Sequence, residues 1–159
     1  YINSVTGRDM LLWNGGCHVH EKFSVEAIVK LKAEHPEAVV MAHLECKAPV
    51  LAVADVKGST ATMLDYAKEH KETKEYIIAT EAGILHELQR CCPDVTFYPV
   101  PPEVSEGGVG CSCNECEYMK KNTLLKIYNT LRYELPEVTI DESIAKDAVK
   151  PIERMLELS

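Results

Sequence analysis

The sequence has no long apolar run. No stretch approaches the roughly 20 consecutive apolar residues that a helix needs to cross a bilayer, so we expect no membrane-spanning role. Basic residues are also scarce, with 17 Lys and Arg against 25 Asp and Glu and a formal net charge of -8. Nucleic-acid phosphates are bound by clustered Lys and Arg, and the only local basic run, at Lys120 and Lys121, is short. The sequence therefore predicts neither a membrane nor a nucleic-acid partner.

A secretory signal peptide is likewise missing, and the cysteine count is odd. Small secreted proteins use an even set of cysteines as a disulfide framework, whereas this chain has seven cysteines in 159 residues. We therefore expect free thiols in a reducing, cytoplasmic compartment. The chain opens at Tyr1 without an initiator Met and reaches the turn-like stretch 6–9 within a few residues, so we expect a truncated start.

Short apolar runs alternate with amphipathic segments along a chain that is 46% hydrophobic and 26% charged. The apolar runs predict buried strands at 10–13, 38–42, 53–56, 75–79 and 96–98, and residues 1–3 are also strand-like. Helices are predicted from a cap at Ser24 to His35, from Pro49, and at about 61–70, 80–90, 118–133 and 141–158. Strands that alternate with helices indicate parallel βαβ units, so we predict an α/β fold with a parallel sheet.

Polar and thiol side chains follow the predicted strands, at the end where ligands collect in open parallel sheets. These side chains are Cys17, His20, His43, Glu45, Ser59, Thr60 and Glu81. Glu81 also stands at a predicted helix start, where the helix dipole favours a carboxylate. We therefore expect the functional site along this one edge of the sheet.

Three thiols lie close together in a glycine-flanked loop, at Cys111, Cys113 and Cys116. Thiolates so spaced can reach one soft metal, so zinc and an iron-sulfur cluster are both open, as are redox thiols and simple packing. A structural zinc site would need a fourth ligand, which no nearby Cys or His clearly supplies. Cys91 and Cys92 precede a predicted strand and are expected in the core.

A second candidate is the glycine-containing loop that carries Cys17, His18 and His20. Such a trio can bind zinc, form a Cys/His nucleophile pair, or be an ordinary loop. A nucleophile would need a group that orients the histidine and an oxyanion hole, and neither is identifiable in the sequence.

His43 and Glu45 alternate along an extended segment, so their side chains point the same way. Such a pair can polarise a hydroxyl and move a proton, or it can be two solvated groups at a strand end. Cys46 beside them is expected to be a small buried hydrophobe rather than a ligand. Ser59 and Thr60 at a predicted helix start suit a phosphate or a carboxylate, and would look the same as a plain helix cap.

Six segments, taken together and in order, resemble quinolinate synthase and cover nearly the whole chain. They are Tyr1-Ile2-Asn3-Ser4, Trp13-Asn14-Gly15-Gly16-Cys17-His18-Val19-His20, Ala42-His43-Leu44-Glu45-Cys46, Val56-Lys57-Gly58-Ser59-Thr60, Thr80-Glu81-Ala82-Gly83 and Cys116-Glu117-Tyr118-Met119-Lys120-Lys121-Asn122-Thr123-Leu124. No single segment is decisive, but the ordered set is highly specific.

The resemblance implies an enzyme of three similar three-layer αβα domains, related by pseudo-threefold symmetry around a central site. One cysteine from each domain holds a 4Fe-4S cluster, which assigns Cys17 and Cys116 as two metal ligands and places the third in an N-terminal domain outside this chain. Residues 1–20 are then a remnant of the middle domain ending in the Cys17 loop, 21–110 the main αβα domain, and 111–159 the cluster-ligand loop and C-terminal helices.

The reaction implied by the resemblance condenses iminoaspartate with dihydroxyacetone phosphate, releasing phosphate and water to give quinolinate, the precursor of NAD. Three cysteine ligands leave one iron of the cluster open, and this iron can act as a Lewis acid that promotes loss of water. The implied partners are the two substrates, the N-terminal domains of the same enzyme, and the aspartate-oxidising enzyme that supplies iminoaspartate.

The resemblance also assigns residue roles. His43 and Glu45 bind the substrate and serve proton transfers, and Tyr1 joins them as a catalytic group. The substrate-binding set implied by the family is Tyr1, Asn3, His20, His43, Glu45, Ser59 and Thr60, with Ser59 and Thr60 holding a carboxylate or the triose phosphate and His20 close to the cluster.

The sequence departs from the family at two places in its backbone pattern. Leu44 stands where the family has a Pro between the functional His and Glu. Val5 runs directly into Thr6, where the family has a long stretch with a substrate-binding Ser, so we predict an internal gap. We expect the 159 residues alone to be inactive.

A third departure concerns the thiols. Cys111 and Cys113 are not ligands in the family pattern, so they are expected to be a regulatory pair or neighbours of the cluster. The competing hypothesis is a cysteine-rich module in which Cys111, Cys113 and Cys116 hold zinc for structure only.

Overall fold

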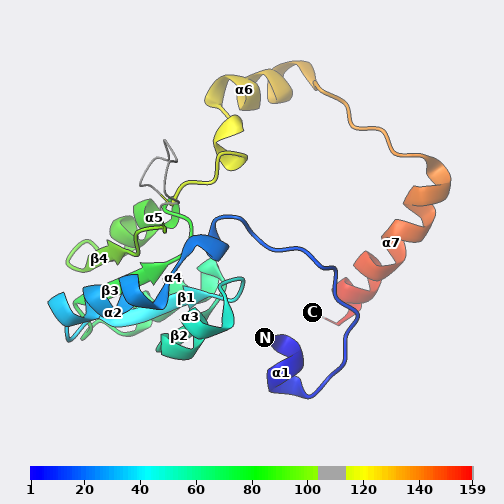
Figure 1. Ribbon diagram of the computed structural model, residues 1–159. Helices are drawn as coiled ribbons and strands as arrows, with labels where there is room; N and C mark the ends of the chain where they lie inside the picture. The colour runs from blue at the N-terminus through cyan, green and yellow to red at the C-terminus, as the bar shows by residue number, and fades with distance from the viewer. Residues whose placement is uncertain (104–113, 159) are drawn as a thin grey trace. The chain divides into compact units, whose positions relative to one another are not determined.

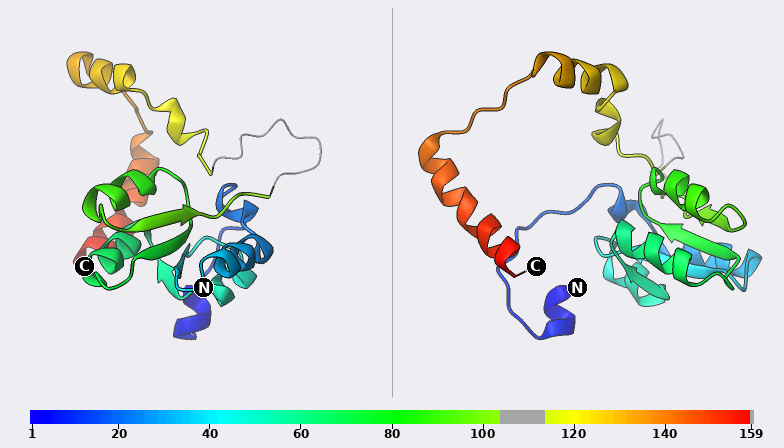
Figure 2. Two further views of the ribbon diagram at one scale, coloured as in Figure 1. Left: turned by 90° about the vertical axis from the view of Figure 1, so that its left-hand side faces the viewer. Right: turned by 180° about the vertical axis from the view of Figure 1, so that it is seen from behind.

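The computed structural model of the protein describes residues 1–103 and 114–158. The chain divides into two compact units, Tyr1–Met119 and Lys120–Ser159 (Figure 1; Figure 2). The predictions for Cys111 and Cys113 fall outside the described residues. The first unit contains the sheet and every candidate site residue that is described.

A four-stranded sheet lies at the centre of the first unit. Its strands are β1 (Val39–His43), β2 (Val56–Gly58), β3 (Glu75–Ala79) and β4 (Thr96–Pro99), in the order β2-β1-β3-β4. Every neighbouring pair is parallel, with Met41 opposite Val56 and Ile77 opposite both Val40 and Tyr98. The predicted α/β fold with a parallel sheet is confirmed.

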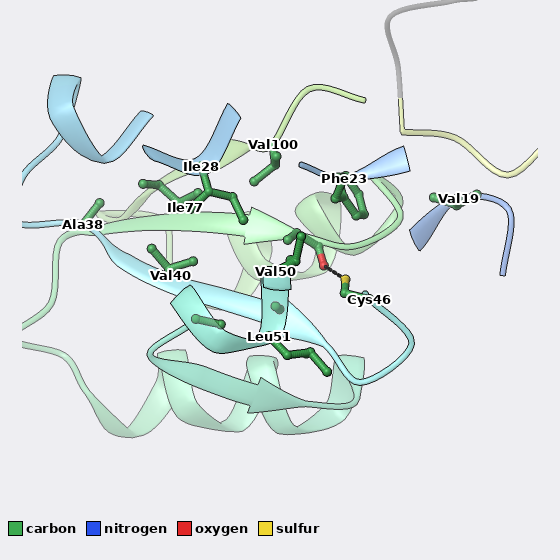
Figure 3. Close-up of a cluster of buried hydrophobic side chains, with 13 residues drawn as sticks. Val19, Phe23, Ile28, Ala38, Val40, Cys46, Val50, Leu51, Ile77 and Val100 are labelled. Atoms are coloured by element: carbon green, nitrogen blue, oxygen red, sulfur yellow. Dashed lines mark hydrogen bonds between the residues drawn. The ribbon is translucent and has the colours of Figure 1, made fainter. Parts of the chain in front are cut away.

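Helices α2 (Val25–Glu34) and α3 (Ala48–Val53) cover one face of this sheet (Figure 1). Val40 of β1 and Ile77 of β3 are buried there with Ile28 of α2 and Val50 of α3, and Figure 3 shows these side chains meeting in one cluster. Each such side chain contributes about 1.5–3 kcal/mol when fully buried. This face of the sheet is therefore a closed apolar layer.

Helices α4 (Thr60–Glu69) and α5 (Ile84–Cys91) cover the opposite face. Met41 and Ile78 alternate with the strand residues of the first face and pack with Met63 of α4 and Leu88 of α5. Burial on both faces explains why the strands read as continuous apolar runs rather than alternating ones. The result is three layers, helices, sheet and helices.

The capping residues of two helices follow from the sequence. Ser24 accepts a hydrogen bond from the Ala27 N–H at the start of α2, and Ser59 accepts one from the Thr62 N–H at the start of α4.

The strand predicted at 53–56 is displaced, because α3 continues to Val53 and β2 begins only at Val56. A proline in the first turn of α3 is compatible with that helix, since its missing N–H has no partner there anyway.

Residues 10–13 do not form the predicted buried strand. They have no regular secondary structure, and the side chains of Leu11 and Trp13 are 102% and 92% exposed. An apolar run becomes a strand only beside a neighbour that pairs its N–H and C=O groups, and no strand among the described residues does so. An apolar run by itself therefore does not predict a buried strand.

The strand-like assignment of residues 1–3 is also wrong. Ile2–Thr6 forms the short helix α1, and Gly7 ends it in the left-handed conformation with φ 66. The Ser4 and Thr6 hydroxyls bond backward to Tyr1 O and Ile2 O at 2.6 and 2.7 Å. These local bonds favour a helical turn over an extended segment.

The second unit consists mainly of α6 (Leu124–Tyr133) and α7 (Glu142–Glu157), in agreement with the two helices predicted for this part of the chain. Thr123 caps α6 and Asp141 caps α7 through their side-chain oxygens. Apolar side chains such as Leu131 and Ile152 are exposed on these helices. Within residues 1–103 and 114–158, no helix combines the length and the apolar character needed to cross a membrane.

Candidate metal and substrate site

The candidate site lies where β1 and β3 end. From β1 the chain goes outward to β2, and it then crosses back to β3 on the other side of β1. In open parallel sheets, ligands bind beyond the carboxyl ends of the two strands at such a change of direction. His43 is the last residue of β1, and Thr80 directly follows β3. The edge predicted from the sequence is therefore the one that the topology favours.

Three predicted site residues converge beyond this edge. The possible ligand atoms of Cys17, His20 and Glu45 all lie within 4.8 Å of one another. His20 Nδ1 is 3.2 Å from Glu45 Oε2, and His43 Nδ1 is 3.5 Å from the same oxygen. The His20 and His43 rings stack with their centroids 4.4 Å apart. One carboxylate thus faces two imidazoles beside a thiol.

The loop that carries Cys17 and His20 is fixed by buried side chains on either side of His20. Val19 is 5% exposed and Phe23 is fully buried, and both belong to the cluster that includes Cys46 (Figure 3). A short 3-10 helix, His20–Lys22, turns the chain between them. The core therefore determines where His20 lies, although the loop itself has little regular structure.

His20 is a buried histidine with one satisfied nitrogen. Its Nε2 lies 2.9 Å from the Thr80 hydroxyl, whereas Nδ1 is buried and has no hydrogen-bond partner among the described residues. The 3.2 Å approach to Glu45 is close enough for an ion pair but is not aligned as a hydrogen bond. Burial first, and then the neighbouring His43, lower the pKa of His20, while Glu45 and Glu81 oppose this effect. The neutral imidazole is therefore the favoured form.

A cavity of about 420 Å³ opens beside this group. Trp13, Gly15, Gly16, Cys17 and Glu45 line it. Cavities of this size accommodate small organic ligands. The Glu45 side chain is 56% exposed, so its carboxylate is accessible from solvent while His20 behind it is not.

Cys46 is buried, as its sequence context predicted. Its thiol donates to the Ala79 carbonyl at 3.5 Å, the interaction drawn as a dashed line in Figure 3. Burial raises the pKa of the Cys46 thiol to about 12, and the nearby Cys17 and Glu45 act in the same direction. A thiol held in its protonated form is a poor metal ligand, since the thiolate is the binding species.

Cys116 is positioned by hydrogen bonds to the loop after β3 and to the end of β4. Glu81 accepts from the Cys116 N–H at 3.2 Å through Oε1 and from the Gly83 N–H at 2.7 Å through Oε2. Asn114, which is 5% exposed, donates from its side-chain amide to the Val100 carbonyl. The segment that carries Cys116 is therefore anchored to two strand ends by polar side chains.

The thiols of Cys17 and Cys116 fit the donor chemistry of an iron-sulfur cluster. Both are free cysteines, both are partly exposed, and both pack against the same buried cluster of side chains. Iron-sulfur clusters are held by Cys thiolates, and a cysteine that forms no disulfide can supply one. Cys116 does not belong to the group of His20 and Glu45 whose ligand atoms lie within 4.8 Å of Cys17.

Tyr1 and Asn3 make only local interactions. Tyr1 stands at the start of α1, and the Asn3 side chain exchanges hydrogen bonds with the backbone of Met10 at 3.2 and 3.3 Å. No hydrogen bond of the described residues joins either of them to His20, Glu45 or their neighbours. Their predicted role in binding substrate stays a prediction.

Ser59 and Thr60 follow β2 at the same sheet edge as His43, because Gly58 is the register partner of His43. Ser59 caps α4 with its hydroxyl, which also lies 3.1 Å from Thr62 Oγ1, and Thr60 is the first residue of that helix. Both residues are exposed. The helix-cap role is thus observed, and the predicted anion-binding role remains a prediction.

Sequence reasoning missed the functions of two buried polar residues. Thr80 is 1% exposed and orients His20, and Asn114 is 5% exposed and bonds to Val100. A hydroxyl directly after the buried residues 76–79 is a usable signal for Thr80, because a polar group at the edge of the core is buried only with a hydrogen-bond partner. For Asn114 we find no comparable signal in its loop.

Comparison with known proteins gives a consistent result. The model of the family described as "Quinolinate synthetase A protein" matches residues 1–157. Proteins named quinolinate synthase are 47% identical in Microcystis aeruginosa, 47% in Nostoc punctiforme and 46% in Chloroherpeton thalassium, each over 159 residues and 100% of this chain. The matches cover 48%, 47% and 48% of those proteins. The chain spans about half the length of the curated relatives it matches.

Proposed function

The chain belongs to the quinolinate synthetase A family, and on this premise we propose that it forms part of the active site of a quinolinate synthase. The observation that carries the proposal is the convergence of Cys17, His20 and Glu45 at the strand ends, beside a cavity of about 420 Å³. Every one of these residues lies in a segment through which the sequence resembles the family. The remaining part of the site is supplied from outside the 159 residues, in a larger enzyme of three αβα domains.

Cys17 and Cys116 would hold a 4Fe-4S cluster together with a third cysteine from outside this chain. When bound, such a cluster supplies one open iron that acts as a Lewis acid on a substrate oxygen. The fit rests on two free, partly exposed thiols that pack against one core. Buried Cys46, whose thiol bonds to the Ala79 carbonyl, is not a ligand.

Glu45 is the residue best placed to move protons. Its carboxylate is half-exposed at the cavity and lies 3.2 Å from His20 Nδ1 and 3.5 Å from His43 Nδ1. A carboxylate beside His20 Nδ1 can exchange a proton with that ring without leaving the site. His43 Nδ1 accepts a hydrogen bond from the Glu45 N–H at 3.3 Å, and this contact orients Glu45 against the His43 ring. His20, anchored by Thr80, then fixes the position of Glu45 relative to the Cys17 thiol.

The reaction proposed is the condensation of iminoaspartate with dihydroxyacetone phosphate to quinolinate, with loss of phosphate and water, in the biosynthesis of NAD. Ser59 and Thr60 would hold a substrate carboxylate or the triose phosphate at the start of α4, where free N–H groups favour an anion. Tyr1 and Asn3 would contact the substrate from the N-terminal segment. The aspartate-oxidising enzyme that supplies iminoaspartate is a proposed partner, and the cytoplasm the proposed compartment.

Quinolinate formation by the full-length protein tests this function. Under anaerobic conditions, the wild type should form quinolinate from the two substrates. Glu45→Gln should abolish turnover and leave the cluster spectrum unchanged, because the amide keeps the side-chain shape but cannot take up a proton. Glu26→Gln, at an exposed position in α2, is the control and should retain activity. Loss of the cluster in Glu45→Gln would instead make Glu45 a structural residue.

A further inference from the structure

We propose that Cys17, His20 and Glu45 bind a single divalent transition-metal ion, such as Zn²⁺, in protein that carries no iron-sulfur cluster. This set shares only Cys17 with the cluster ligands proposed above. The site therefore differs from the cluster in its donors, its stoichiometry and its consequence for the enzyme.

The distance between two of the donors matches the edge of a zinc tetrahedron. Zinc bonds to imidazole nitrogen and carboxylate oxygen at about 2.1 Å, so two such ligands on one ion lie about 3.4 Å apart. His20 Nδ1 and Glu45 Oε2 are separated by 3.2 Å. All three donor atoms, including the Cys17 sulfur, lie within 4.8 Å of one another. A sulfur and a nitrogen or oxygen ligand on one zinc ion lie about 3.6 Å apart. The partly exposed Cys17 and the half-exposed Glu45 would therefore close in on the buried His20 when the ion binds.

The unpartnered nitrogen of His20 points to a ligand. The residue is 6% exposed, and its Nδ1 has no hydrogen bond among the described residues although a carboxylate oxygen is 3.2 Å away. A buried polar atom without a partner is destabilising, because it has lost its hydrogen bonds to water and gained none in return. The direct contact between Nδ1 and Glu45 Oε2 is not aligned for hydrogen bonding and leaves Nδ1 without a partner. A cation bound between the two atoms would give each of them one.

Thr80 already supplies the outer contact that metal-bound histidines require. The Thr80 hydroxyl lies 2.9 Å from His20 Nε2 and holds the ring in one orientation. When Nε2–H donates to this hydroxyl, Nδ1 carries no proton and is free to bind a cation, with Glu45 Oε2 3.2 Å away. Metal-ligating histidines generally make such a bond through their other nitrogen.

The donor types select zinc or a similar ion over calcium or magnesium. Thiolate and imidazole are ligands for Zn²⁺ and other late transition metals, whereas Ca²⁺ and Mg²⁺ prefer oxygen alone. Three protein ligands leave the fourth position of a tetrahedral ion open, and the cavity beside Cys17 and Glu45 has room for water there.

Zinc at this site would compete with the iron-sulfur cluster for the Cys17 thiolate. Because Cys17 cannot ligate zinc and the cluster at once, bound Zn²⁺ would block cluster assembly. The site would thus make the cluster-free protein sensitive to zinc.

Zinc titration of the reduced, cluster-free full-length protein tests the proposal. We expect one equivalent of Zn²⁺, with affinity at least about tenfold lower in Cys17→Ser and in Glu45→Gln, and about 10–100-fold lower in Thr80→Val, which removes only the outer contact. The double variant Cys111→Ser/Cys113→Ser is the matched control and should bind as the wild type does. Circular dichroism checks that each variant is folded, and Glu45→Gln, at a half-exposed position, keeps the test valid if buried variants unfold.

Two further results bear on the proposal. Preloaded Zn²⁺ should slow the uptake of iron and sulfide in the wild type and not in Glu45→Gln. The proposal is overturned if no zinc binds, if Cys17→Ser and Glu45→Gln bind as the wild type does, or if binding disappears in the Cys111→Ser/Cys113→Ser variant. None of these readouts depends on quinolinate formation, so a failure here is distinct from a failure of the proposed function.

Discussion

At the scale of single residues, burial divides the cysteines and histidines of the site into different chemical roles. Cys17 is partly exposed beside a cavity, whereas Cys46 is 6% exposed. His20 is buried against Thr80, whereas Glu45 in front of it is open to solvent. Side chains that are neighbours in space therefore differ in protonation and in access, and each difference can be measured.

Cys46 should resist alkylation in the folded protein. Its burial and its pKa near 12 leave almost no thiolate at neutral pH, whereas Cys17 and Cys116 are partly exposed. Iodoacetamide followed by mass spectrometry should label Cys17 and Cys116 before Cys46 in the cluster-free protein, and Cys46 only after denaturation. Labelling of Cys46 as fast as Cys17 would show that the thiol is accessible and would contradict the structure.

The residue types of the site could be predicted from the sequence, but the contacts between them could not. His43 and Glu45 stand at the end of a strand that was predicted and is observed, β1, and the topology of parallel sheets explains their place. Cys17 and His20 were expected after a strand at 10–13 that does not form, and the buried side chains of Val19 and Phe23 position their loop instead. The stacking of His20 on His43 and the bond to Thr80 depend on how the loop before α2 packs into the core. Packing of that kind is set by distant side chains and has no local sequence signature.

At the scale of elements, helix starts and strand ends carry the polar groups that position the site. Ser59 begins α4, and Glu81 joins the loop after β3 to the backbone of Cys116. Ser59 is observed as a helix cap and proposed as a substrate contact. Glu81 is observed to position Cys116, a proposed metal ligand. Substitution of either residue can therefore test its proposed role.

The two roles of Ser59 can be separated by two substitutions. Ser59→Ala removes the cap of α4 and should lower the free energy of unfolding by about 1 kcal/mol, whereas Ser59→Asp keeps a capping oxygen and should restore it. If Ser59 also holds an anionic substrate, the Asp variant should be stable but should have a raised KM. Chemical denaturation and steady-state kinetics give the two readouts. A stable Asp variant with wild-type KM would limit Ser59 to the helix cap.

Glu81 should control how firmly Cys116 holds iron. Both carboxylate oxygens accept backbone hydrogen bonds, from Cys116 and from Gly83, and Gln retains only one acceptor. Loss of one such bond to a carboxylate costs about 1.5–3 kcal/mol, at least roughly tenfold in an equilibrium constant. Glu81→Gln should therefore release iron to a chelator at least roughly tenfold more readily. Glu87→Gln, on the exposed surface of α5, is the control. If both variants release iron at the same rate, Glu81 does not stabilise iron binding by Cys116.

At the scale of the whole molecule, the sheet and its covering helices were predictable because the patterns are local and strong. Strands buried on both faces read as apolar runs, as at Glu75–Ala79, and capped amphipathic helices separate them. The run at 10–13 has the same apolar character but no pairing strand among the described residues, so the same rule fails there. Pairing is a property of the fold and not of the segment.

At the same scale, the 159 residues are not expected to form a complete active site. They match about half the length of their relatives, and two thiols cannot by themselves complete the ligation of a cluster. We therefore propose one cysteine ligand in the loop before α2, one in the segment held by Glu81, and the third in protein outside this chain. In this proposal Cys17 and Cys116 bind the same cluster.

Anaerobic purification of the full-length protein with its cysteine variants tests that claim most directly. The wild type should be brown, with the visible absorbance, iron and acid-labile sulfide of an iron-sulfur protein. Cys17→Ser and Cys116→Ser should each lose all three, while the Cys111→Ser/Cys113→Ser variant should keep them. A colourless wild type that holds stoichiometric zinc, and loses it when Cys111 and Cys113 are replaced, would contradict the account.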